Sequence, residues 1–255
     1  MSWDALNDWV CGEPVGTVPV DAVHLQDPNT GAQREPMATA RPESIQTALE
    51  RAAEIHRTRL WSGRTPEQRA LVLEQIANAL EGRTQRLAEV AASTTGVVIT
   101  QTDRFARLIP LIFRNAATLL RDDANETYPG PFSPVEVHRL PIGPALCISP
   151  WNAPTAIAAH KVASALAAGC PTILKPSEWA PHTASLLAQA IYESELPAGT
   201  FQLLHGRGDV GARLTSDERI RAVSFTGGLV GGRAVAVACA EQMKPAQLEL
   251  GGNNP

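Results

Sequence analysis

The sequence predicts an α/β fold, in which an amino-terminal helical layer precedes a doubly wound, Rossmann-like parallel sheet of about five strands. Two observations support this fold class. The carboxyl-terminal half alternates short apolar runs with helical segments, as parallel strands joined by crossover helices do. The amino-terminal half instead repeats apolar residues at the three- and four-residue steps of helices. We therefore divide the chain into an arm with a helical layer, residues 1–134, and a sheet core, residues 135–255.

The composition excludes several classes of protein. A net charge of −4 over 255 residues leaves no basic face for nucleic acid. No apolar run reaches the length of a membrane span, and Met1 to Asp4 lack the basic start of a secretion signal, so we expect a cytoplasmic protein without membrane contact. The four cysteines are widely spaced without a Cys-x-x-Cys pair, so we expect no metal site and no disulfide framework.

The amino-terminal half is expected to contain one irregular segment and several helices. Residues 1–40 contain four prolines and a turn-rich stretch from Asp27 to Gly31, which indicates an irregular arm on the surface. Thr65-Pro-Glu-Gln68 has the sequence of a capping box with proline at the first helical position, so a helix is expected to start there. Further helices are expected at 42–59, 83–93 and 102–122.

The carboxyl-terminal half is expected to alternate strands with helices. After a polar linker at 122–134, residues 135–139 alternate as a half-exposed strand does. Residues 145–149 are apolar between two prolines and predict a buried strand, which the helix 155–168 connects to a strand at 172–174. Further strands are expected at 200–204, 222–226 and 246–250, and further helices at 182–195, 209–215 and 229–243.

Polar side chains follow the first two strands of this predicted sheet. Because ligands collect beyond the carboxyl ends of parallel strands, these side chains are candidates for a binding site. Lys175 and Glu178 could serve a nucleotide ribose, although a salt bridge within the loop is slightly favoured when the two residues are taken alone. Asn152 could aim its amide at an oxyanion, but an asparagine in a turn often serves its own backbone. The candidates at these two strand ends are Trp151, Asn152, Lys175, Ser177 and Glu178.

A glycine-rich turn, Phe225-Thr-Gly-Gly-Leu-Val-Gly-Gly232, joins a later strand to a helix. Glycines there let the backbone approach a ligand while the helix amino terminus offers N–H groups to phosphate. Packing and turn formation are the alternative explanation for the same glycines. At the end of the last strand, Glu249 lies between leucines and is a candidate general base, although an acid in that position is often only solvated.

The cysteines and histidines are weaker candidates. Cys147 and Cys170 fall within predicted strands and Cys239 within a helix, where thiols usually behave as small apolar residues. His160 and His205 have no acidic or cysteine partner at ligand spacing. We therefore expect none of these residues to be a nucleophile or a metal ligand.

The order and spacing of these motifs resemble the aldehyde dehydrogenase superfamily. The resemblance extends from about Asp27 to the last residue, and its amino-terminal part rests on Asn29-Thr-Gly31, Trp61 and Arg69-Ala70. The carboxyl-terminal motifs occur in family order: Pro150-Trp-Asn152, Ala165-Leu-Ala-Ala-Gly169, Lys175-Pro-Ser-Glu178, Leu196-Pro-Ala-Gly199, Gly206-Arg-Gly208, Phe225-Thr-Gly227 and Glu249-Leu-Gly-Gly252.

The resemblance implies roles for the matched positions. It implies that residues 135–255 form an NAD-binding core, that Asn152 stabilises an oxyanion, and that Glu249 activates the deacylating water. Lys161 matches a family position near the catalytic pocket. A carboxylate at Glu178 repels a 2′-phosphate, which favours NAD over NADP. The implied cofactor-binding residues are Ser149, Pro150, Trp151, Lys175, Ser177, Glu178, Gly208, Phe225, Thr226, Gly227, Gly228, Gly232 and Leu250.

The chain departs from the family pattern in two places. Gly228 stands where the family usually has serine, which removes a hydroxyl that can reach the pyrophosphate. The family's nucleophilic cysteine lies a few dozen residues beyond the Glu-Leu-Gly-Gly motif, past Pro255, so we expect the chain to carry the cofactor-binding half and to be inactive alone.

These expectations leave three hypotheses open. The leading one is the cofactor-binding half of an NAD-dependent enzyme that oxidises a small-molecule aldehyde to an acid, working as a homo-oligomer or with a complementing catalytic half. The alternatives are a non-catalytic nucleotide-binding or regulatory subunit, and a degenerate truncated remnant. In every case we expect residues 135–139 to form an unpaired strand arm and the open sheet edges to favour association.

Overall fold

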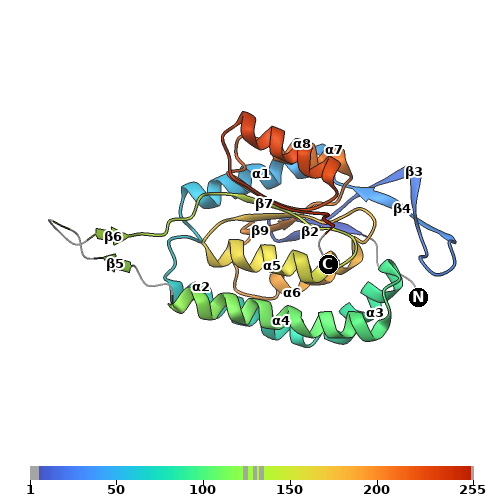
Figure 1. Cartoon of the computed structure of the whole chain (residues 1–255), viewed down its shortest axis with the longest axis horizontal. Helices are drawn as coiled ribbons and strands as arrows, with labels where there is room; N and C mark the ends of the chain where they lie inside the picture. Colours follow the sequence, from blue (N-terminus) through green and yellow to red (C-terminus); the bar gives the residue numbers. More distant parts are fainter. Residues whose placement is uncertain (1–5, 123–125, 129–130, 132–134, 254–255) are drawn as a thin grey trace.

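The computed structural model describes residues 6–122, 126–128, 131 and 135–253 and shows a central sheet between two layers of helices (Figure 1). Seven strands form this sheet in the order β11-β10-β7-β8-β9-β1-β2. The first five of these strands are parallel, and β1 and β2 are antiparallel to their neighbours. The doubly wound α/β fold class predicted from the sequence is therefore confirmed. The parallel strands are β7 (Ala145–Ile148), β8 (Thr172–Lys175), β9 (Phe201–Leu203), β10 (Ala222–Gly227) and β11 (Ala246–Leu250).

The sheet reverses its direction of growth at β7. From β7 the chain adds β8 and then β9 on one side, crossing through α5 (Pro154–Ala167) and α6 (His182–Tyr192). It then returns through α7 (Gly208–Thr215) to place β10 on the other side of β7, and α8 (Leu229–Glu241) leads on to β11. The carboxyl ends of β7 and β10 thus form a topological switch point, where sheets of this type bind ligands.

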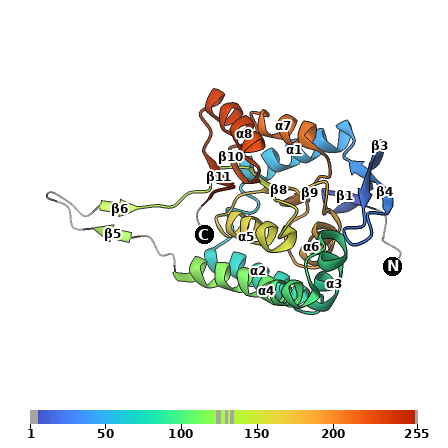
Figure 2. The same cartoon turned by 45° about the vertical axis from the view of Figure 1, so that its right-hand side comes forward.

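Side chains of the buried strands alternate between two hydrophobic cores. Leu146 and Ile173 point into the core beneath α1 (Pro42–Arg57), α7 and α8, whereas Cys147 and Leu174 point into the core beneath α5 and α6. Such alternation follows from the two-residue period of a strand with both faces covered. Both views show α1, α7 and α8 on one side of the sheet and the remaining helices on the other (Figure 1 and Figure 2).

A second tier of helices covers α5 and α6. It consists of α2 (Pro66–Glu81), α3 (Thr84–Thr95) and α4 (Ile99–Asp122). The start of α2 has the predicted capping box, with Gln68 N–H donating to Thr65 Oγ1 and Thr65 N–H donating to Gln68 Oε1. Buried Trp61 connects the tiers, since its indole N–H donates to the Leu166 carbonyl oxygen of α5 at 2.8 Å. The helical layer therefore shares one core with the sheet.

The structure corrects the prediction of an irregular amino-terminal arm. Four strands form there: β1 (Asn7–Val10), β2 (Glu13–Gly16), β3 (Val18–Gln26) and β4 (Gln33–Thr39). β3 and β4 pair as a separate ribbon, while β1 pairs with both β2 and β9 and so extends the main sheet. Residues 1–5, where the sequence was inspected for a secretion signal, lie outside the described part of the chain.

The expectation of an unpaired strand at 135–139 is also wrong. β6 (Val135–Val137) pairs antiparallel with β5 (Glu126–Tyr128), which lies in the segment expected to be a linker. In that segment residues 123–125, 129–130 and 132–134 are outside the described part of the chain. The β5–β6 hairpin projects from the body of the molecule (Figure 1).

Candidate functional site

A cleft of about 950 Å³ lies at the carboxyl ends of the parallel strands. It is lined by the last residues of β7, β8, β10 and β11, by residues that follow these strands, and by one side of α7 and of α8. Asn152, Glu178 and Glu249 all line it, although they come from three different strand ends. The volume falls within the range of small-molecule and cofactor sites. The structure therefore brings together most of the side chains that the sequence singled out.

The end of β7 places Ser149 and Asn152 in the cleft. Ser149 is buried, and its hydroxyl has no hydrogen-bond partner among the described residues. The Asn152 carbonyl oxygen Oδ1 accepts from the Ala153 backbone N–H at 3.1 Å, which is the local turn role considered from the sequence. Its amide nitrogen makes no hydrogen bond within the described part of the chain and can still donate to a ligand. Pro150 and half-exposed Trp151 complete this wall.

The loop after β8 holds a buried lysine beside a carboxylate. The Lys175 ammonium donates to the Pro176 carbonyl oxygen at 2.7 Å and also to the Gly206 carbonyl oxygen. Its nitrogen lies 3.8 Å from Glu178 Oε2. Burial lowers the pKa of Lys175 to about 8, against the opposing effect of Glu178. Because two of three ammonium protons are engaged by carbonyls, one remains for Glu178 or for a ligand in the cleft.

The loop after β8 also contains Ser177, whose hydroxyl accepts from the Trp179 backbone N–H at 3.3 Å. Ser177, Glu178 and Trp179 all line the cleft, and the Trp179 side chain is half exposed. Gly208, at the start of α7, lines the cleft as well. A β-carbon at Gly208 would meet nothing within 4 Å, so space beside it is open to a ligand.

The glycines after β10 have two different roles. A β-carbon at Gly227 would lie 2.7 Å from the Phe225 ring, and one at Gly231 would lie 3.0 Å from it, so both glycines are needed for packing on Phe225. A β-carbon at Gly228 would meet nothing within 4 Å. Gly228 is also the N-cap of α8 and provides no side-chain cap, which leaves the first N–H groups of α8 available to an anion. Thr226 lies between these glycines and Phe225 and lines the cleft.

Gly232 lies outside the cleft lining. A β-carbon there would lie 2.3 Å from Leu250 Cδ2, so Gly232 makes room for the Leu250 side chain. Leu250 itself lines the cleft. In this structure Gly232 therefore contributes to the cleft through the position of Leu250.

The apolar end of the cleft was not predicted from the sequence. There, small or apolar residues of α7 face similar residues of α8 across a slot: Gly211, Ala212, Thr215 and Ser216 on one side, and Val230, Gly231, Ala234, Val235 and Ala238 on the other. Each set repeats at helical steps of three or four residues, a pattern that also describes ordinary helix packing. A slot with small side chains on both walls fits a flat ring.

Comparison with known proteins places this geometry in a family. The model of the aldehyde dehydrogenase family matches residues 18–255. The chain belongs to the aldehyde dehydrogenase family. It is 35% identical over 215 residues to geranial dehydrogenase of Castellaniella defragrans, covering 83% of this chain and 45% of that protein. It is 32% identical over 266 residues to betaine aldehyde dehydrogenase of Cereibacter sphaeroides, covering 98% of this chain and 52% of that protein.

Solved structures of the aldehyde dehydrogenase family share the fold. Aldehyde dehydrogenase C of Pseudomonas syringae, solved as a mutant with NAD+ and octanal, superposes with a TM-score of 0.88 at 31% identity. The match covers 98% of this chain and 51% of that one. The chain thus spans about half the length of the relatives it matches.

Two residues implied by the family resemblance meet in a second hollow of about 490 Å³ on the α5 side of the sheet. Lys161 lines it together with Glu249, which therefore borders both hollows. The Lys161 ammonium donates to Ser224 Oγ at 2.7 Å, and Ser224 donates to Gln247 Oε1 at 3.0 Å. Burial lowers the pKa of Lys161, whereas nearby Cys147 and Glu249 act in the opposite direction.

The cysteines are free thiols that do not line the main cleft. Cys147, in β7, is buried, and burial raises its pKa to about 12, which keeps it protonated at neutral pH. Burial also raises the pKa of Cys11 and Cys239. Within the described part of the chain no three metal-ligating side chains come together, and no helix has the length and apolarity of a membrane span.

Proposed function

We propose that this chain binds NAD in the main cleft and forms the cofactor-binding part of an enzyme that oxidises an aldehyde to a carboxylic acid. The observation that carries the proposal is the convergence of strand ends on one cleft, next to an uncapped amino terminus of α8. The NAD+ bound to the related aldehyde dehydrogenase C supports the same assignment. When bound, NAD supplies the hydride acceptor of the oxidation.

The residues of the cleft fit a dinucleotide. The uncapped N–H groups of α8 and the open space at Gly228 suit the pyrophosphate. The buried hydroxyl of Ser149 has no hydrogen-bond partner in the described part of the chain and borders the cleft, so a bound dinucleotide would supply that partner. Lys175 and Glu178 suit ribose hydroxyls because one donates and the other accepts. The apolar slot between α7 and α8 suits the adenine ring.

The preference for NAD over NADP rests on Glu178. Its carboxylate lines the cleft next to the ammonium that we assign to the ribose. A 2′-phosphate would bring two negative charges close to this carboxylate, and repulsion is strong where water is partly excluded. Lys175 does not offset this repulsion fully, because its single positive charge already lies 3.8 Å from the Glu178 carboxylate.

We assign the catalytic roles to three side chains. The amide nitrogen of Asn152 donates to the oxyanion that develops on the substrate carbonyl. Glu249, exposed at the end of β11, takes a proton from the attacking water. Lys161 provides a positive charge across the second hollow from Glu249. None of the described cysteines lines the main cleft, so we assign the nucleophilic thiol to the part of its relatives that this chain does not span.

Thermal unfolding with and without nucleotide tests cofactor binding. A ligand that binds only the folded state raises the unfolding midpoint by mass action, by the equivalent of about 2.7 kcal/mol at a hundred times its Kd. We expect NAD to raise the midpoint and NADP to raise it less at equal concentration. No change at millimolar NAD would overturn the proposal.

A matched pair of variants makes the result specific to the cleft. Glu178→Gln removes the carboxylate at the proposed ribose site, whereas Glu195→Gln makes the same change in the exposed loop before β9, at the opposite edge of the sheet. We expect only Glu178→Gln to alter the response to NAD. Equal responses of the two variants would place the nucleotide elsewhere.

A further inference from the structure

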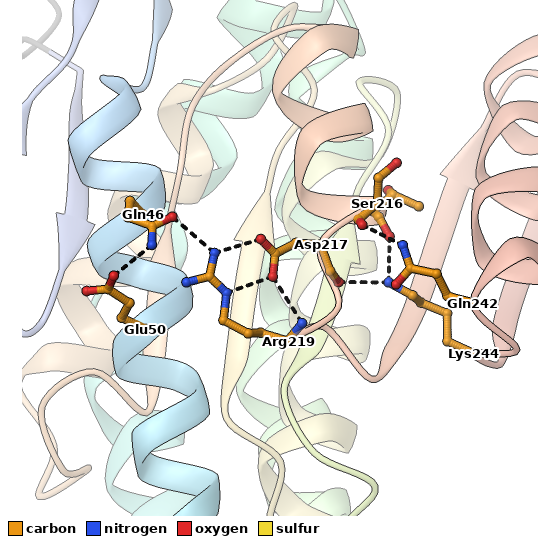
Figure 3. Close-up of polar contacts among 8 residues, drawn as sticks. Gln46, Glu50, Ser216, Asp217, Arg219, Gln242 and Lys244 are labelled. Carbon is orange, nitrogen blue, oxygen red and sulfur yellow. Dashed lines mark hydrogen bonds and ion pairs between the residues drawn. The ribbon is translucent and has the colours of Figure 1, made fainter.

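The segment at the end of α8 forms hydrogen bonds with the end of α7. We call this segment, Gln242 to Lys244, the clamp. The Lys244 ammonium donates to the carbonyl oxygen of Thr215 at 2.7 Å and to that of Asp217 at 2.8 Å. Gln242 Nε2 donates to the carbonyl oxygen of Ser216 between them. Three successive carbonyls at the carboxyl terminus of α7 are therefore bound by two side chains from the far end of α8 (Figure 3).

Two features of the clamp are energetically unfavourable by themselves: a buried ammonium and a left-handed backbone conformation. Lys244 is buried, and burial lowers its pKa, whereas Cys239 and Asp217 act in the opposite direction. Its two carbonyl partners replace hydrogen bonds that the ammonium would otherwise make to water. Met243, between Gln242 and Lys244, has φ of +52° and a side chain that is 91% exposed. A left-handed backbone at a residue other than glycine is strained, and here it accompanies a turn that directs both flanking side chains to α7.

The clamp lies directly behind the apolar slot of the main cleft. Thr215 and Ser216, whose carbonyls it binds, line the slot from α7, and Ala234 and Ala238 line it from α8. The clamp thus joins the two walls at one end. Dispersion contacts with a flat ring lose a quarter to a half of their strength when a gap widens by about 0.5–1 Å. The spacing of the walls therefore controls how well a ring is bound.

We propose that Lys244 and Gln242 are positioning residues that set the width of the slot and thereby the affinity for the adenosine half of the cofactor. This inference rests on the proposed function, because it takes the slot as the adenine site. It adds a pair of residues that neither line the cleft nor touch the ligand. The ligand chemistry is that of an adenine nucleotide, for which AMP is the simplest probe.

The test compares three variants of the full chain by AMP calorimetry, well below their unfolding midpoints. Lys244→Met keeps the length of the side chain but removes both hydrogen bonds, and we expect it to weaken AMP binding about tenfold. Lys244→Arg retains a donor that can reach two carbonyls, and we expect it to restore most of the affinity. Gln242→Ala removes one hydrogen bond at an exposed position, and it replaces Lys244→Met in the test if that variant fails to fold. We expect Gln242→Ala to lower AMP affinity twofold to threefold, on the order of 0.5 kcal/mol.

A control variant separates positioning from general stability. Arg219 binds the Asp217 carboxylate and Gln46 of α1, in the same network but away from the slot (Figure 3). We expect Arg219→Met to lower the unfolding midpoint and leave AMP affinity within twofold of wild type. Unchanged AMP affinity in both Lys244→Met and Gln242→Ala would overturn the positioning role alone. Failure of the wild-type chain to bind AMP or NAD would overturn the proposed function as well.

Discussion

The ammonium of Lys175 lies 3.8 Å from the carboxylate of Glu178, at the end of β8 and inside the main cleft. The lysine is 4% exposed and is also bound by the carbonyls of Pro176 and Gly206. The pair therefore presents a fixed donor beside a more exposed acceptor. This arrangement determines the expected choice of cofactor and the expected pH dependence of NAD affinity.

Glu178→Gln is expected to weaken the preference for NAD. The amide keeps the size and the accepting oxygen of the carboxylate but removes the charge that repels a 2′-phosphate. We expect the ratio of the NADP Kd to the NAD Kd to fall by about tenfold, or 1.4 kcal/mol. Calorimetric titration of wild type and variant with both nucleotides measures this ratio. An unchanged ratio would show that another group selects the cofactor.

NAD affinity is expected to fall as the pH rises through about 8. Burial lowers the pKa of Lys175 to about 8 from an ordinary value of 10.5. The ammonium has a third proton for the ligand and the neutral amine does not, so the binding-competent form is present below pH 8 and is lost above it. Titrations at pH 7 and pH 9.5 measure the loss. Lys175→Met is expected to bind weakly at both values, and a wild-type chain with a flat profile would contradict the assignment.

Stability is expected to fall below pH 6.5 because of His182. This histidine starts α6, is buried, and lies 2.9 Å from Glu35 Oε1. Burial lowers its pKa below the ordinary value of 6.5; Arg34 and His205 lower it too, and Glu35 raises it. The unfolded chain thus binds a proton that the folded chain does not, so unfolding becomes easier as the pH falls.

His182→Gln tests this pH dependence, since glutamine places an amide near Glu35 but does not titrate. Urea unfolding at pH 7.5 and pH 5 is expected to show a loss on the order of 1 kcal/mol for wild type and a smaller loss for the variant. Equal losses would assign the acid sensitivity to other groups.

The parallel sheet and its ligand-binding edge could be predicted from the sequence because each depends on local patterns. The strand Thr172–Lys175 has apolar Ile173 and Leu174 at its centre, is fully buried and is bounded by prolines, and polar Ser177 and Glu178 follow it closely. In a parallel sheet such ends must meet at one edge. That is why residues as distant in sequence as Asn152 and Glu249 could be assigned to one site before the structure was known.

β1 could not be predicted in the same way. It contains Asp8, a residue type depleted in strands, and Asp8 is completely buried. Its carboxylate accepts from the backbone N–H of His205, 197 positions away, at 2.7 Å. A partner so distant leaves no trace in a local pattern. The slot between α7 and α8 could not be predicted for a similar reason, since its small residues form a site only when the two helices face each other.

Gly232→Ala is expected to damage the cleft without touching the ligand. The added β-carbon would lie 2.3 Å from Leu250 Cδ2, so Leu250 must move, and it lines the cleft. Overpacking of this kind costs about 1–3 kcal/mol of stability. We expect a lower unfolding midpoint together with weaker NAD binding, measured by thermal unfolding and calorimetry. Full retention of both would mean that Leu250 has room to move that the structure does not show.

Gly228→Ser is expected to improve NAD binding. Gly228 is the N-cap of α8 with φ of −72° and ψ of 158°, an extended conformation that serine adopts freely, and a β-carbon there meets no atom within 4 Å. Serine is preferred over glycine at N-caps by a few tenths of a kcal/mol, so the variant should fold at least as well.

The hydroxyl of Gly228→Ser also adds a donor where the pyrophosphate is assigned, and one hydrogen bond to a charged group is worth about 1.5–3 kcal/mol. We therefore expect tighter NAD binding by calorimetry, whereas Gly228→Ala should stay close to wild type because it adds the β-carbon without the donor. Equal affinities for the serine and alanine variants would show that the pyrophosphate does not lie at the start of α8.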